Sequence, residues 1–165
     1  MSARSDPGGW LVPLVVAAGA AGLVAALGAT LTELGPWYRS LAQPDWTPPD
    51  LVFPIAWTTI FALAALSATT AWRAMPTAVE REWLVALFAF NGFLNILWSL
   101  LFFRLQRPDW ALVEVGLLWG SVAALMMFVG RRSRLAAWLL VPYLAWVSVA
   151  ALLNWEVVRL NAPFG

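Results

Sequence analysis

Five long apolar runs, separated by short polar segments, dominate the hydrophobic pattern of the chain. About 20 apolar residues in a helix cross the hydrocarbon core of a bilayer. None of the runs alternates as a barrel strand would, so each predicts a transmembrane helix. The predicted spans are Trp10–Leu31, Leu51–Trp72, Trp83–Phe103, Trp110–Val129 and Leu135–Val158. The pattern therefore predicts an all-α membrane protein, with residues 1–165 forming a single five-helix domain.

Four segments connect these runs, and only the first, residues 32–50, is long. Around it, the stretch PDWTPPDLVFPIAW (residues 44–57) holds four prolines and two tryptophans. Proline fixes φ and lowers the entropy of a loop before folding. Asp50 is positioned to cap the second span. These features predict either a stiff aromatic lid over the bundle or a rigid connector, and composition alone favours neither.

The composition agrees with a membrane protein and removes several kinds of chemistry. The chain is 62% hydrophobic and 12% charged, whereas soluble domains carry roughly 25% charged residues. The net charge of +1 favours no nucleic-acid partner. His, Cys and Lys are absent, which excludes a Cys/His metal site, a His or Cys haem ligand, a His- or Cys-based catalytic dyad and a Schiff base.

The arginines favour one topology. Loops on the cytoplasmic side of a membrane carry an excess of basic residues. The predicted N-terminal side holds Arg4, Arg73, Arg81, Arg131, Arg132 and Arg134, and the opposite side holds Arg39, Arg104, Arg107 and Arg159. This distribution predicts a cytoplasmic N-terminus and places segment 32–50 on the other side of the membrane.

Aromatic and amide side chains form stripes at helical spacing. The stripes are Phe53, Trp57 and Phe61 on the second span, Asn91, Asn95, Trp98 and Phe102 on the third, and Trp146, Ala150 and Asn154 on the fifth. An amide is unfavourable in lipid, so these asparagines should face the bundle interior. There they would either bond to neighbouring helices or contact a mostly apolar ligand. The single acidic residue of the fourth span, Glu114, is expected to pair with Arg104 or Arg107.

Four stretches resemble the translocator protein family, also called the tryptophan-rich sensory protein or peripheral benzodiazepine receptor family. They are WYRSLAQPDWTPPDLVFPIAW, LNILWSLLFF, QRPDWALVEVGLLWG and PYLAWVSVAALLNWEVVRLN, and the resemblance covers about residues 10–161. It implies five transmembrane helices around a ligand pocket, closed by the first loop, in a homodimer. The basic residues are all arginine, which favours a bacterial member of the family, so a protein of the bacterial cell envelope is expected.

The resemblance also implies a ligand and the residues that contact it. Family members bind porphyrins such as protoporphyrin IX, so protoporphyrin IX or haem is the expected ligand, with no required cofactor. Trp57 and Trp146 match the pocket tryptophans that are linked to porphyrin degradation. Residues Asn95, Trp98 and Ala150 match other pocket positions, and residues Trp37, Trp46, Pro48 and Pro49 match the lid. Trp155 replaces the tyrosine of the sterol-recognition pattern ahead of Arg159, which argues against sterol binding.

Three functions therefore stay open: a membrane tetrapyrrole sensor or regulator, a light- and oxygen-dependent enzyme that degrades protoporphyrin, and a carrier of apolar ligands. An aromatic slot would stack the flat ring. The propionates of the ring would need a cation or water at the mouth, and Arg39 is a candidate by position. Phe53, Asn91 and Asn154 complete the expected ligand contacts.

Overall fold

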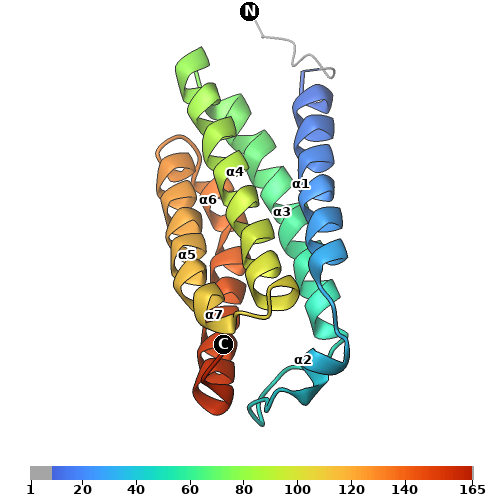
Figure 1. Ribbon diagram of the computed structural model, residues 1–165. Helices are drawn as coiled ribbons and strands as arrows, with labels where there is room; N and C mark the ends of the chain where they lie inside the picture. Colours follow the sequence, from blue (N-terminus) through green and yellow to red (C-terminus); the bar gives the residue numbers. More distant parts are fainter. Residues whose placement is uncertain (1–8, 165) are drawn as a thin grey trace, which may run out of the picture.

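Five membrane-length helices form the bundle in a computed structural model that describes residues 9–164 (Figure 1). Every regular element in this range is helical. The order is α1 (Leu11–Leu31), α2 (Pro36–Ser40), α3 (Val52–Ala74), α4 (Ala78–Ser99), η1 (Leu100–Arg104), α5 (Pro108–Gly130), α6 (Arg134–Leu139) and α7 (Val141–Asn161). The prediction of an all-α protein with five membrane-spanning helices is confirmed.

Local sequence signals explain where the helices begin and end. Helix α4 begins at Ala78 rather than at Trp83 because Thr77 accepts a hydrogen bond from the Glu80 amide, as in a capping box. The fifth span is divided into α6 and α7 at Leu140, and Pro142 occupies the first turn of α7, where its missing N–H is tolerated.

The predicted cap at Asp50 is wrong. Helix α3 begins at Val52, its N-cap residue is Leu51, and no side chain caps it. The Val52 amide instead donates to the Pro49 carbonyl at 2.8 Å. A backbone turn thus precedes the helix in place of a side-chain cap, and the Asp50 carboxylate does not bond to the helix N-terminus.

Helix α5 packs closely against both α4 and α7, and α1 lies at the edge of the bundle, where it packs closely against α3 (Figure 1). The buried core includes Leu94, Val122, Leu125 and Val147. Helix α1 packs against α3 and α4 but contains no buried residue. A helix that is apolar on all sides and exposed along most of its length suits contact with lipid.

Among the described residues, the two predicted groups of arginines lie at opposite ends of the bundle. The α3–α4 and α5–α6 connections lie at the end where α1 begins, and segment 32–50 lies at the opposite end (Figure 1). Arg131 and Arg132 belong to the second of these connections, and Arg73, Arg81 and Arg134 lie in the helix ends beside them. Arg4 falls outside the described residues. Which end faces the cytoplasm stays a prediction.

The expected ion pair of Glu114 is wrong. Arg104 pairs with Glu33, and Arg107 pairs with Asp109, only two residues away, at 2.5 Å. Glu114 is 4% exposed, and neither of its carboxyl oxygens has a hydrogen-bond partner. Both arginines therefore pair with acids other than Glu114, and the Glu114 side chain is buried within the bundle.

Gly92 lies where α1 and α4 pack closely together. A Cβ atom built at Gly92 would lie 2.9 Å from Cγ2 of Val24, whereas a Cβ at Gly116 would meet nothing within 4 Å. Real Cβ atoms do not approach another carbon so closely. A small residue is therefore required where α4 meets α1, as in many membrane helix pairs.

We expect Gly92→Ala to destabilise the protein in detergent, because Val24 and α1 must shift. Gly116→Ala is the matched control and should stabilise it by roughly 0.5–1 kcal/mol through helix propensity. Thermal unfolding followed by circular dichroism measures both. Equal stabilisation of the two variants would contradict the close packing at Gly92.

We expect Glu114→Gln to leave the thermal stability unchanged or to raise it, because an unpaired buried carboxyl gains nothing from a charge. Asp109→Asn should lower the stability by about 1 kcal/mol, since it breaks an existing charge-assisted pair. Melting temperatures of the two variants in one detergent test this contrast. A loss at Glu114→Gln as large as that at Asp109→Asn would show that Glu114 has an ionic partner.

Candidate ligand-binding cavity

A cavity of about 740 Å³ lies between α1, α3, α4, η1 and α7, under segment 32–50. Its volume falls within the range of about 300–1,000 Å³ that is common for small-molecule sites. The α1 side is built from small residues, among them Ala18, Ala21, Gly22 and Ala25. Because these side chains are short, α1 can close the cavity and still leave it wide.

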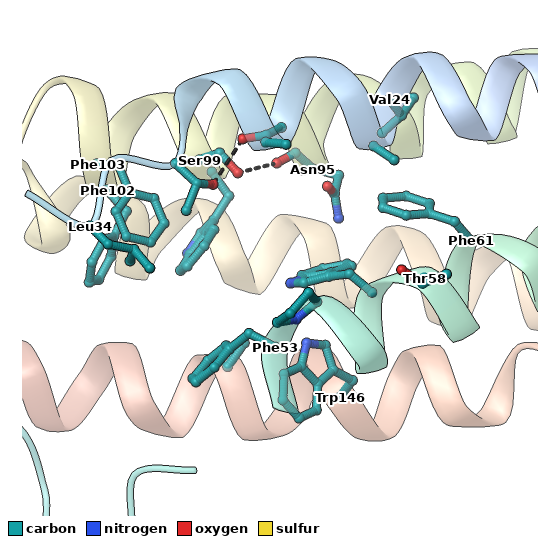
Figure 2. Close-up of a pocket in the computed structure, with 18 of the residues that line it drawn as sticks. Val24, Leu34, Phe53, Thr58, Phe61, Asn95, Ser99, Phe102, Phe103 and Trp146 are labelled. Carbon is teal, nitrogen blue, oxygen red and sulfur yellow. Dashed lines mark hydrogen bonds between the residues drawn. The ribbon is translucent and has the colours of Figure 1, made fainter. Parts of the chain in front are cut away.

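Most of the predicted aromatic and amide residues line this one cavity. They are Phe53, Trp57, Asn95, Trp98, Trp146, Ala150 and Asn154. Figure 2 shows Phe53 and Trp146 on one side of the open space and Asn95 on another, with Phe61 and Thr58 beside them. The three stripes expected from helical spacing therefore converge.

The aromatic rings of the wall hold one another in place. Trp57 stacks on Phe61, with ring centroids 5.5 Å apart and an interplanar angle of 25°. Phe53 meets Trp146 edge to face at 5.6 Å, and Trp98 stacks on Phe102 at 5.1 Å. Such pairs contribute about 0.5–1.5 kcal/mol each beyond area burial, so the cavity has a fixed aromatic surface.

A chain of buried polar groups supports the wall from behind. The Asn95 Nδ2 donates to the Tyr143 hydroxyl at 3.2 Å, and this hydroxyl donates to Asn91 Oδ1 at 2.9 Å. The Asn91 Nδ2 then donates to Ser121 Oγ at 2.8 Å. Asn91 does not line the cavity; its amide joins α4 to α5 and α7.

Asn154 forms a second bridge between helices. Its Oδ1 accepts from the Trp98 indole N–H at 3.1 Å, and its Nδ2 donates to the Pro108 carbonyl at 2.8 Å. Asn154 therefore lines the cavity with both polar atoms of its amide already paired. The bond from the Trp98 indole N–H to Asn154 also fixes the plane of the indole ring.

Two donors in the cavity wall lack partners. The Trp146 Nε1 and the Gln43 Nε2 are both buried without a hydrogen-bond partner, and both residues line the cavity. A buried polar group without a partner is unfavourable. Both atoms lie beneath the surface of the wall, so a ligand acceptor would reach them only after a side-chain rotation.

Segment 32–50 closes the cavity with residues other than those expected. Leu34, Tyr38, Gln43, Thr47 and Asp50 line the cavity from this segment. Trp37, Trp46, Pro48 and Pro49 do not line it. Trp37 instead packs against Phe102 at 6.2 Å, and Trp46 is 49% exposed. Arg39, the candidate partner for propionates, is exposed on α2 and does not line the cavity either.

A residue that the sequence did not single out holds this segment. Asn161, the last residue of α7, accepts from the Ala42 amide at 2.8 Å and donates to the Ala42 carbonyl at 2.9 Å. The salt bridge between Glu33 and Arg104 anchors the start of the same segment to η1. Burial raises the pKa of the Tyr38 hydroxyl, and the negative charge of Asp50 raises it further.

The π-helical turn η1 adds two aromatic walls. Leu105 N–H bonds to the Leu100 carbonyl at 2.9 Å, and Gln106 adopts a positive φ of 55° where the chain turns. Phe102 and Phe103, which follow one another in this turn, both line the cavity (Figure 2). Single π-helical turns are common at functional sites.

Comparison with known proteins agrees with this architecture. Residues 11–160 match the model of the TspO/MBR family. The chain belongs to the TspO/MBR family. It is 39% identical over 129 residues to the "Tryptophan-rich protein TspO" of Chlorobaculum tepidum, covering 76% of this chain and 79% of the relative.

Two further relatives show how widely this family extends. The chain is 39% identical to "Protein CrtK" of Rhodobacter capsulatus over 130 residues, covering 77% of this chain and 79% of the relative. It is 35% identical to the human "Translocator protein" over 127 residues, covering 76% of this chain and 75% of the relative. The resemblance noted in the sequence is therefore confirmed, and the protein is an integral membrane member of the TspO/MBR family.

We expect Tyr143→Phe to destabilise this TspO/MBR protein by about 1–3 kcal/mol, because it leaves Asn91 and Asn95 with unpaired buried amides. Phe61→Leu, a substitution of an aromatic residue with no hydroxyl, is a useful comparison because it leaves the amide network intact. Melting curves in detergent measure both effects. Full stability of Tyr143→Phe would contradict a supporting role for the network.

Proposed function

We propose that this protein binds a flat, mostly apolar tetrapyrrole of the protoporphyrin IX type in the cavity and acts as a membrane sensor or regulator of porphyrin or stress metabolism. One observation carries the proposal: Trp57, Asn95 and Trp146 lie around a single void of about 740 Å³. Aromatic faces suit a planar ring, and the few polar groups suit orientation of a mostly apolar ligand.

The sequence adds a preference for the metal-free ring. With neither His nor Cys in the chain, no His or Cys side chain can act as an axial ligand to haem iron. Binding would then rest on stacking and apolar burial.

A sensory role is supported by the relatives and by the architecture. A protein of Cereibacter sphaeroides named "Tryptophan-rich sensory protein" is 38% identical over 125 residues. The chain has no internal repeat, a feature on which many transporter folds are built. The segment over one end of the cavity is anchored to α7 and η1, which favours retention of a ligand over its rapid passage.

Titration of the detergent-purified protein with protoporphyrin IX should quench tryptophan fluorescence with saturation. Trp57→Leu and Trp146→Leu should each weaken binding about 2- to 10-fold, the loss of one aromatic contact. Trp138→Leu is the matched control, since Trp138 is 70% exposed and does not line the cavity. Quenching without saturation, or an equal loss at Trp138→Leu, would rule out binding in this cavity.

A further inference from the structure

The charge of the cavity wall is unusual for a site that takes a dicarboxylic ring. Among the described residues that line the cavity, Asp50 is the single charged side chain. Arg39 lies on the outer side of the same segment. A carboxylate of the ligand that enters beside Asp50 would meet a like charge, with no cavity-lining arginine to offset it.

The same end of the cavity offers a donor that needs an acceptor. Gln43 lies in the wall near the mouth, and its Nε2 is buried without a partner. The two bonds between Asn161 and the Ala42 backbone hold the adjacent residue in place. The backbone beside Gln43 is thus held in place, and rotation of the Gln43 side chain would bring its Nε2 to an acceptor of the ligand.

We propose that Asp50 and Gln43 make the mouth selective for ligands whose lid-facing edge carries neutral carbonyl acceptors, as in an ester or amide, over ligands that place carboxylates there. This selectivity rests on the proposed tetrapyrrole function. A neutral carbonyl accepts from Gln43 without repulsion from Asp50. A carboxylate accepts equally well but is repelled, and it also loses more hydration on entering the cavity.

The deciding experiment compares protoporphyrin IX with its dimethyl ester. Dissociation constants of both are measured in one detergent for the unmodified protein, Asp50→Asn and Asp45→Asn. Asp45 is the matched control because it is an exposed acid of the same segment that does not line the cavity. The quantity compared is the ratio of the two constants, acid over ester, because partitioning into micelles then cancels between proteins.

We expect Asp50→Asn to lower this ratio about fivefold through tighter binding of the free acid. Asp45→Asn should leave it within about twofold, since Asp45 is exposed like Asp50 but does not line the cavity. The ratio of the unmodified protein should also fall as salt is raised. An equal ratio in all three proteins, or a ratio lowered equally by both substitutions, would overturn the role of Asp50.

Gln43→Leu tests the donor with a second pair of ligands. It should weaken binding of the dimethyl ester several-fold but leave etioporphyrin, which has alkyl groups and no carbonyl, unchanged. Equal losses for both ligands would overturn the role of Gln43. If none of these porphyrins binds with saturation to the unmodified protein, the proposed function itself fails, and that result is distinct from saturable binding without selectivity.

Discussion

The requirement that buried polar groups be paired inside the membrane organises this bundle. Lipid offers no hydrogen-bond partners, so each amide of the interior must find one on a neighbouring helix. The amide groups of Asn91 and Asn95 meet at the Tyr143 hydroxyl, and Asn154 joins Trp98 to the Pro108 carbonyl. These bonds link α4, α5 and α7 into one unit, against which the aromatic side chains take fixed orientations.

Helix α1 is held differently, and the cavity follows from that difference. It packs through small side chains and contributes no buried residue. The hydrogen bonds hold α4, α5 and α7 on one side, and α1 presents only short side chains on the other side. The space between them is therefore not filled by side chains, and it forms the cavity. A fully packed bundle of the same helices would need larger residues on α1, and the aromatic stripe of α3 would then face side chains instead of an open space.

Periodicity was enough to predict the five helices and their inward-facing stripes, because membrane spans have a strong hydrophobic pattern. That Trp57, Asn95 and Trp146 share one pocket was implied by the family resemblance. The inner face of the lid could not be predicted in this way. Trp37 and Trp46 were plausible ligand contacts by type, but packing of α2 on η1 directs Trp37 to Phe102 and leaves Tyr38 and Asp50 at the mouth. The ion-pair partners of Arg104 and Arg107 could not be predicted either, because they depend on the path of the loops that carry the acids.

The bond between Asn161 and Ala42 connects the tail of the chain to the roof of the cavity. Any movement that lifts the roof must release the final turn of α7 or drag it along. Opening of the cavity at this end would therefore change the last turn of α7, outside the bundle interior. A fluorescent label attached beyond residue 161 would report on the interior from a distance.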